Sequence, residues 1–261
     1  SIFFRVFPPP LTMTEVRTLI FDIDDTMYPV SSGFSDHRNG EAVIGRFMVE
    51  RLGFSSRAEA LQLRNEYFQR FHSTLKGLTV ATEEGKLSIP FKQEDLGEFW
   101  AEHCEFSKYL QPVPAFIEAL QSLQAQTSLT FVAFSNSPRK YALRCLDFLG
   151  VRAFFPDDHV FGVEDVMPAC KPERAAFDKV LNAVGALPEE AVIFEDSMKN
   201  IRACKALGMH TVLIHEAAGG EAALLGDVPT TEDPAVDAVL RNIGELRTSL
   251  PGLWEQRMPL R

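Results

Sequence analysis

Apolar runs rich in β-branched and aromatic residues alternate with segments of helical periodicity along most of the chain. Such alternation is typical of a parallel sheet whose strands are joined by crossover helices. The first predicted strand is Arg17–Asp22. Further strands are predicted at Leu129–Ser135, His159–Phe161, Ala191–Phe194 and Thr211–Ile214. Five strands in alternation with helices predict an α/β fold with a doubly wound parallel sheet.

Three of the predicted helices are followed at once by glycine, the residue that most often ends a helix. They span Pro138–Leu149, Pro172–Val184 and Met198–Leu207. A closing helix is predicted over Val236–Leu246. These helices would cover the two faces of the sheet.

The stretch from residue 28 to residue 108 lacks β-rich runs and shows helical periodicity, as in Glu41–Leu52 and Ala58–Phe71. It interrupts the chain directly after the first strand, so it would lie above the carboxyl ends of the strands, where α/β sheets bind ligands. We therefore expect a core domain of residues 1–27 and 109–261 and a helical cap domain of residues 28–108. The first dozen residues are predicted to be a loosely held arm.

Composition restricts the class of partner. Hydrophobic residues make up 46% and charged residues 24% of the 261 residues, as in ordinary globular domains. The net charge of -10 argues against a nucleic-acid or anionic-membrane binder, and no apolar run is long enough to span a bilayer. Four cysteines without paired spacing fit a reducing, cytoplasmic compartment. An anionic small substrate would require a local cation.

The acidic segment Asp22-Ile23-Asp24-Asp25-Thr26 directly follows the first predicted strand. Asp22 is placed to attack phosphorus, and the chain turn would bring Asp24 near the leaving oxygen for proton transfer. A carboxylate is repelled by a phosphate dianion, so a divalent cation must neutralise both, and oxygen ligands favour magnesium. The alternative is an acidic loop that only ends a strand.

Glu195 and Asp196 end another predicted strand and therefore lie at the same edge of the sheet. Two adjacent acids in this position repel each other unless water or a cation compensates their charge. We interpret them as further magnesium ligands, with solvation as the alternative.

Ser135 and Asn136 follow the second predicted strand and precede a helix, where a hydroxyl and backbone N–H groups can hold phosphate oxygens. Helix capping explains the same residues equally well. Lys171 precedes a helix and would supply a fixed positive charge, although a solvated loop lysine is the simpler interpretation.

Taken together, these groups resemble the four motifs of the haloacid dehalogenase superfamily over about Thr18 to Ile214. The resemblance implies that Asp22 is the nucleophile and a magnesium ligand, and that Asp24 is the acid and base whose backbone carbonyl also contacts the metal. It further implies the remaining roles: phosphoryl binding by Ser135 and Lys171, magnesium ligation by Glu195 and Asp196, and support of the loop by Thr26.

A finer likeness is to the pyrimidine 5′-nucleotidase branch of that superfamily. It rests on Asp-Thr-Met-Tyr-Pro with Ser31-Ser32-Gly33, on Leu75-Lys76-Gly77-Leu78, on Cys-Lys-Pro, and on Asp196-Ser197 followed by Lys199-Asn200-Ile201. The sequence departs from the branch in having Glu195 where aspartate is common and Ser135 where threonine is common. The likeness implies a nucleoside monophosphate as the small phosphorylated substrate.

Aromatic residues of the cap, Tyr67, Phe68, Phe71 and Trp100, are candidates for stacking on a base. Their helical spacing fits the core of the cap equally well. His72 and His103 are expected to be surface or packing residues of the cap, with contact to the substrate as the alternative. His215-Glu216 with Gly219-Gly220 is expected to form a surface turn.

Four other functions stay open at this point. A phosphomutase or a sugar-phosphate phosphatase of the same superfamily would share every core residue named. A dehalogenase would need neither Asp24 nor the Glu195-Asp196 pair, because attack on a neutral carbon requires no magnesium. A catalytically silent binding module would have lost a functional side chain, and none is lost here.

Overall fold

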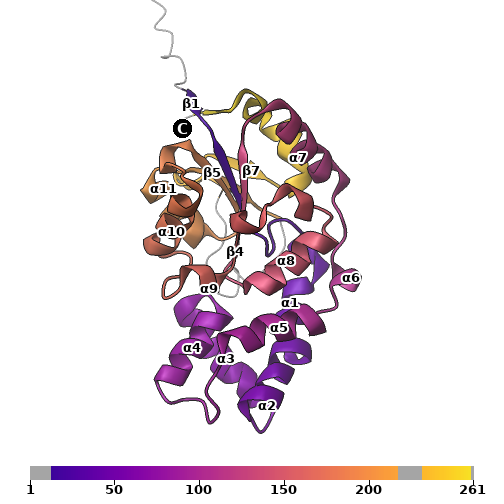
Figure 1. Ribbon diagram of the computed structural model, residues 1–261, viewed down its shortest axis with the longest axis vertical. Helices are drawn as coiled ribbons and strands as arrows, with labels where there is room; N and C mark the ends of the chain where they lie inside the picture. Colours follow the sequence, from indigo (N-terminus) through magenta and orange to yellow (C-terminus); the bar gives the residue numbers. More distant parts are fainter. Residues whose placement is uncertain (1–12, 217–230, 260–261) are drawn as a thin grey trace, which may run out of the picture.

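A parallel six-stranded sheet forms the centre of the molecule in the computed structural model, which describes residues 13–216 and 231–259 (Figure 1). The strand order is β4-β3-β2-β5-β6-β7, and every neighbouring pair is parallel. The strands are β2 (Thr18–Phe21), β3 (Thr130–Phe134), β4 (Val160–Phe161), β5 (Ala191–Glu195), β6 (His210–Ile214) and β7 (Ala238–Leu240). The predicted fold class is therefore confirmed.

Helices cover both faces of this sheet, so its central strands are buried on both sides. On one face, α7 (Pro114–Gln126) and α8 (Arg139–Phe148) contribute to the cluster that contains Phe21. On the other face, α10 (Arg174–Val184) and α11 (Met198–Leu207) pack in the cluster that contains Ile20. Every residue of β2, β5 and β6 is buried, which explains their largely apolar sequences.

The predicted closing helix at Val236–Leu246 is wrong. Residues Ala238–Leu240 form β7, which pairs with Val212–Ile214 of β6 and adds a sixth strand. Only short helical turns follow, at Ile243–Glu245, Leu246–Ser249 (α13) and Pro251–Glu255. A short apolar run is compatible with either a strand or a helix, and pairing at the sheet edge decides between them here. A separate antiparallel pair joins β1 (Met13–Glu15) to β8 (Arg257–Pro259).

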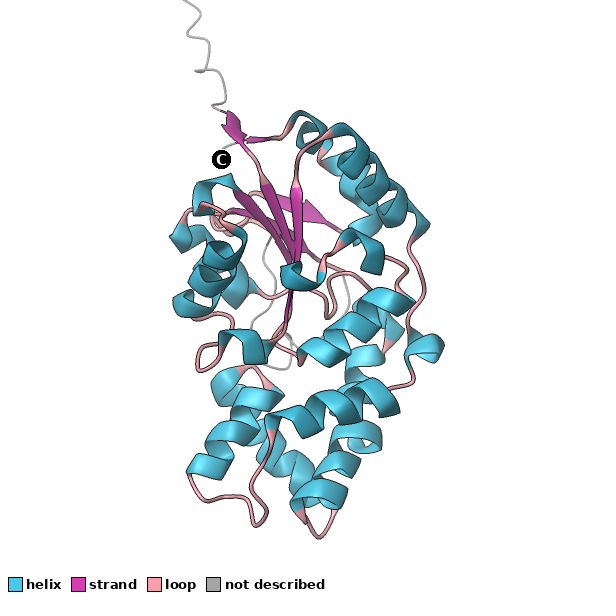
Figure 2. Ribbon diagram, in the orientation of Figure 1, coloured by secondary structure: helices cyan, strands magenta, loops and turns pink. Residues whose placement is uncertain are grey.

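The helical insertion expected after the first strand lies at the carboxyl ends of the sheet strands (Figures 1 and 2). Its main helices are α2 (Arg46–Leu52), α3 (Arg57–Phe71), α4 (Thr74–Glu83) and α5 (Gln93–His103). A π-helical turn at Glu41–Gly45 leads into α2. The chain enters the cap through α1 (Phe34–Asn39) and leaves it through α6 (Phe106–Tyr109).

Shorter elements complete the described part of the chain: α9 (Val163–Val166) and turns at Val30–Ser32, Arg152–Phe154, Asp157–His159 and Pro188–Glu190. Within the described residues, no helix is both long and apolar enough to cross a membrane. The predicted arm of residues 1–12 and the glycine pair Gly219-Gly220 lie outside the described residues.

The cap packs closely on the core at two places. A Cβ atom on Gly97 of α5 would lie 3.2 Å from the Cβ atom of Pro138, so glycine lets α5 approach the start of α8. At the second place, Ser73 Oγ donates a 2.9 Å hydrogen bond to the backbone oxygen of Asn136, and Lys76 forms an ion pair with Glu173. The carboxyl edge of the sheet is thereby covered by the cap.

Candidate active site

A cleft between the sheet edge and the cap contains most of the chemistry predicted from the sequence. Its volume is about 720 Å³, including the space that is open to solvent. Its floor comes from the ends of the sheet strands and its roof from α1, α3 and α5. The lining includes the predicted residues Asp22, Asp24, Asn136, Lys171, Glu195 and Asp196, whereas the predicted Ser135 and Thr26 are buried beside it.

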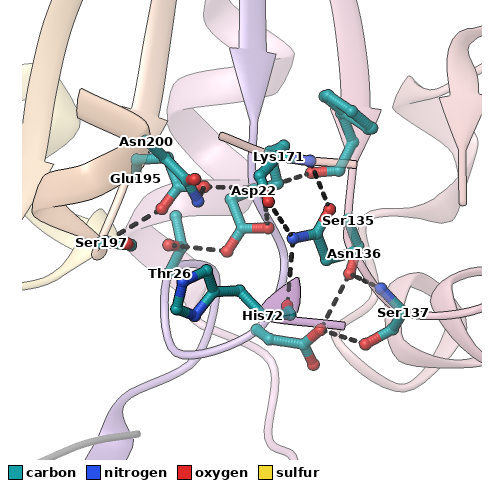
Figure 3. Close-up of polar contacts among 12 residues, drawn as sticks. Asp22, Thr26, His72, Ser135, Asn136, Ser137, Lys171, Glu195, Ser197 and Asn200 are labelled. Carbon is teal, nitrogen blue, oxygen red and sulfur yellow. Dashed lines mark hydrogen bonds and ion pairs between the residues drawn. The ribbon is translucent and has the colours of Figure 1, made fainter. Parts of the chain in front are cut away.

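Asp22 lies at the centre of the floor, directly after β2. Its Oδ1 accepts a 2.6 Å hydrogen bond from Lys171 Nζ, and its Oδ2 accepts a 3.2 Å bond from Thr26 Oγ1 (Figure 3). Burial raises the pKa of Asp22 to about 8, although the Lys171 ammonium opposes this rise. The carboxyl group is thus held in place and needs positive charge to remain ionised.

Lys171 is buried beside Asp22 and supplies one such positive charge. Its Nζ donates to Asp22, to Glu195 Oε1 at 2.7 Å and to the backbone oxygen of Phe134 at 3.0 Å. Burial disfavours the charge of Lys171, but the two carboxylates outweigh burial and raise its pKa. The ammonium is therefore a fixed cation beside the predicted nucleophile.

Asp22, Glu195 and Asp196 form a cluster whose carboxylate oxygens lie within 4.8 Å of one another. Burial, together with the negative charges of Glu195 and Asp22, raises the pKa of Asp196 well above its usual range. The Lys171 ammonium offsets one of these three negative charges, and the cluster of carboxylate oxygens fits a hard divalent cation such as magnesium. The residues present therefore fit the expected cofactor.

Glu195 has a second function in this cluster. Besides Lys171, its carboxylate accepts a 2.6 Å bond from Asn200 Nδ2 and a 3.0 Å bond from the backbone N–H of Ser197. It thereby fixes Lys171 against the start of α11. Asp196 remains the better candidate for a direct metal ligand.

Asp24 has an entirely different environment from Asp22. Its carboxylate accepts hydrogen bonds from Tyr28 and Tyr141, each 2.8 Å long, and forms an ion pair with Arg38. Ser135 Oγ at 2.9 Å and Ser137 Oγ at 2.7 Å complete its surroundings. Burial alone would raise the pKa of Asp24, but Arg38 and the hydroxyl donors lower it to about 2.

Ser135 and Asn136 lie beside the floor, as the sequence predicts, and both make several contacts. Besides bonding to Asp24, Ser135 Oγ accepts a 2.9 Å bond from the backbone N–H of Ser137. Asn136 Oδ1 accepts from the Lys171 backbone N–H at 2.9 Å, while its Nδ2 donates to the backbone oxygens of Lys171 and His72. Asn136 thus connects the loop that contains Lys171 to His72 of the cap. The role of Asn136 in binding phosphate stays a prediction.

Residues 16–208, well over half of the chain, match the family model of the haloacid dehalogenase-like hydrolases. The chain belongs to this family. The expected superfamily and the expected enzyme class, a hydrolase of phosphoric monoesters, are both confirmed at the level of the family. The finer pyrimidine 5′-nucleotidase assignment stays a prediction.

Two relatives and one solved structure illustrate the range of similar proteins. The phosphorylated carbohydrates phosphatase of Thermotoga maritima is 30% identical over 141 residues, which are 53% of this chain and only 63% of that protein. The pyrophosphatase PpaX of Halalkalibacterium halodurans is 24% identical, covering 89% of this chain and 95% of its own length. A HAD phosphatase from Thermococcus onnurineus shares the fold with a TM-score of 0.56 and 22% identity, over 89% of this chain and 97% of its own.

Several lining residues of this haloacid dehalogenase-like hydrolase were not predicted from its sequence. Arg38, Arg64 and Asn39 come from the cap side, and no local motif marks them. His72 was expected to be a surface or packing residue, yet it lines the cleft with a φ of 53° and places its Nε2 3.3 Å from Lys199 Nζ. His103 instead packs its ring against Phe99 in the cap. Lys199 and Asn200 were already part of the likeness to the pyrimidine 5′-nucleotidase branch. That likeness is the sequence signal that pointed to these two residues.

Proposed function

We propose that this hydrolase is a magnesium-dependent phosphomonoesterase that works through an aspartyl-phosphate on Asp22. One observation carries the proposal: a buried carboxylate, a buried ammonium and two further acids converge at the carboxyl edge of the sheet. Each would do a separate task in phosphoryl transfer. A dehalogenase would not need the acidic cluster, because its target carbon is neutral.

In the first half of the reaction, an oxygen of Asp22 attacks phosphorus while the bond to the leaving oxygen breaks. Asp24 gives the leaving oxygen a proton. In the second half, Asp24 takes a proton from the water that attacks the acyl phosphate, and phosphate and free Asp22 are released. Asp22, Glu195 and Asp196 would hold magnesium, which neutralises charge on the phosphoryl group when it is bound.

Lys171 and Thr26 support the nucleophile in this scheme. Lys171 bonds to one oxygen of Asp22 and Thr26 bonds to the other, so the carboxylate has a fixed orientation. The Lys171 ammonium also offsets the negative charge of an incoming phosphoryl group. Ser135 would donate its hydroxyl hydrogen to a phosphoryl oxygen after releasing Asp24.

A pyrimidine nucleoside monophosphate is our first candidate substrate. Of the four aromatic residues considered for stacking, Phe68 and Trp100 line the cleft. Tyr67 is instead buried and bonds to Glu84, so it belongs to the framework of the cap. An aromatic roof above a phosphate site favours a flat leaving group, for which stacking contributes about 1–3 kcal/mol per base.

A sugar phosphate is the second candidate. The Thermotoga maritima relative is named for phosphorylated carbohydrates, and the roof also contains Arg64 and Asn39, which can bind hydroxyl groups. Arg64 already stacks on Phe68, with its guanidinium carbon 4.1 Å from the ring centroid. The roof therefore combines polar and aromatic surface.

A phosphate-release screen with and without magnesium tests both levels of the proposal. We expect uridine and cytidine monophosphates to give higher kcat/KM than hexose phosphates, and activity to vanish when a chelator removes the metal. A clear preference for hexose phosphates would overturn the nucleotidase assignment and leave the chemistry intact. Isomerised sugar phosphate without released phosphate would instead identify a phosphomutase.

A further inference from the structure

Arg38 is a buried cation that the chemistry above does not use. It belongs to α1, on the cap side of the cleft, and is 4% exposed. Its guanidinium carbon lies 5.0 Å from the ring centroid of Trp100 in α5 and 5.0 Å from that of Tyr141 in α8. The two ring centroids are 5.4 Å apart, so Arg38 packs against a pair of touching rings, one from the cap and one from the core.

The guanidinium group of Arg38 is directed at Asp24. Arg38 Nη1 forms an ion pair with Asp24 Oδ1 and also donates to Tyr141 OH at 2.8 Å and to Ser137 Oγ at 3.2 Å. Both of these hydroxyls donate in turn to Asp24, Tyr141 at 2.8 Å and Ser137 at 2.7 Å. A hydroxyl that accepts from Arg38 has its own hydrogen left for Asp24, so one guanidinium orients two further donors.

We propose that Arg38, which packs against an aromatic ring of the cap and an aromatic ring of the core, is a positioning residue for the acid and base Asp24. The proposal rests on the function proposed above for Asp24. Arg38 acts through Asp24, because it fixes the carboxyl group from which the proton leaves. The rings of Trp100 and Tyr141 in turn hold the guanidinium in this position.

The physical reason is that proton transfer depends steeply on geometry, and a misplacement of about 1 Å can cost about a hundredfold in rate. Without Arg38, Asp24 would keep only neutral hydroxyl donors in a buried site, with Lys171 and any bound cation as competing attractors. Its carboxylate would then turn away from its present position. The loss of rate would be largest for substrates whose leaving oxygen most needs a proton.

The test compares two leaving groups in Arg38→Met and Arg38→Lys variants. Phenol requires protonation as it leaves, whereas 4-nitrophenolate scarcely does. We expect kcat/KM of Arg38→Met to fall about a hundredfold with phenyl phosphate and less than about tenfold with 4-nitrophenyl phosphate. Arg38→Lys should recover part of the phenyl phosphate rate, and the Arg51→Met variant on the exposed surface of α2 should match the parent protein with both substrates.

Tyr141→Phe, which removes one hydroxyl donor and keeps the ring, provides the same readout if Arg38→Met does not fold. It should lower the phenyl phosphate rate by about tenfold, with a smaller effect on the nitrophenyl ester. Equal losses with both esters, or no loss, in variants with native circular dichroism would overturn the positioning role. Asp24→Asn distinguishes a failure of the acid role of Asp24 from a failure of the positioning role of Arg38. If Asp24→Asn loses the same rate with both esters, the assignment of Asp24 as the acid fails as well. If Asp24→Asn alone loses more rate with phenyl phosphate, only the role of Arg38 fails.

Discussion

Asp22 and Asp24 are separated by one residue and have opposite electrostatic environments. Burial raises the pKa of Asp22 to about 8, while Arg38 and the hydroxyl groups of Ser137, Tyr28 and Tyr141 overcome burial and lower the pKa of Asp24 to about 2. The proposed nucleophile must be ionised to attack phosphorus, so Asp22 would depend on Lys171 and on the proposed magnesium ion. Asp24 is ionised as it stands and is ready to act as a base, but it must gain a proton before it acts as an acid.

The first residue-scale prediction concerns the nucleophile. Asp22→Asn keeps the size of the side chain but cannot form an acyl phosphate, so turnover should fall by at least about a thousandfold, or about 4 kcal/mol in the barrier. Phosphate release from the best substrate of the screen measures this. Asp36→Asn, on the exposed side of α1, is the control and should retain full activity. Activity of Asp22→Asn within about tenfold of the parent protein would exclude Asp22 as the nucleophile.

A second prediction separates Glu195 from Asp196. Asp196→Ala removes a metal ligand, so the magnesium concentration for half-maximal activity should rise by about tenfold or more. Glu195→Gln weakens the hold on Lys171 and Asn200, so it should lower the free energy of unfolding by about 1–3 kcal/mol. Magnesium titrations and urea unfolding measure the two effects. An unchanged magnesium requirement in Asp196→Ala would remove that residue from the metal site.

Local sequence predicts only one part of this site. Asp22, Ser135 and Glu195 were recognisable because each follows or ends a buried strand, and the carboxyl ends of parallel strands meet at one edge. Arg38 and Tyr141 were not recognisable, since they lie about a hundred residues apart on separate helices and meet only when the cap packs on the core. Contacts of this kind depend on helix packing, which no local motif encodes.

At the scale of elements, five of the six strands of the parallel sheet were predicted, including the edge strand β4, whereas the edge strand β7 was predicted as part of a helix. β2, β5 and β6 are buried along their whole length and have largely apolar sequences. β7 has three residues and partial burial, so its sequence resembles a piece of an amphipathic helix. Its pairing with β6, which fixes its conformation, is a property of the assembled sheet.

Gly162 offers a prediction at this scale. It lies directly after β4, and a Cβ atom there would be 2.2 Å from the backbone nitrogen of Arg139 at the start of α8. Gly162→Ala should therefore force α8 away from β4 and lower the free energy of unfolding by about 1–3 kcal/mol, as measured by urea denaturation. Gly45→Ala is the matched control, because its Cβ would make ordinary contacts at 3.4 Å or more and it should be neutral or stabilising. Equal stabilities of the two variants would contradict the close approach.

At the scale of the whole molecule, the cap and the core both contribute residues to the candidate active site. The core supplies the carboxylates and Lys171, and the cap supplies Arg38 together with most of the surface that faces the leaving group. Ser73 and Lys76 of the cap bind the loops that carry Asn136 and Glu173, close to the predicted phosphate site. The cap domain of residues 28–108 stays a prediction. The clustered carboxylates and Lys171 lie outside this range, and Arg38 lies within it.

The last prediction concerns how magnesium and pH together set the stability of the molecule. Without metal, the pKa of Asp22 is about 8 in the folded protein and 3.8 in its ordinary state, so the folded chain binds more protons between these values. The free energy of unfolding contributed by Asp22 therefore falls as pH rises from about 4 to about 8. Asp196, whose pKa is also raised, acts in the same direction. Asp24 acts oppositely, but only below its ordinary value of 3.8, outside this window.

Magnesium should reverse this loss, since it replaces the protons on the cluster and binds the folded chain selectively. We expect the melting temperature of chelator-treated protein to rise on adding magnesium, and to rise more at about pH 8 than at about pH 6, because fewer protons compete at the higher pH. At a concentration of about 100 times Kd the gain would be about 2.7 kcal/mol. Asp196→Ala is the control and should show a much smaller shift at both pH values. A magnesium shift that is equal at both pH values, or that persists in Asp196→Ala, would mean that the metal binds elsewhere.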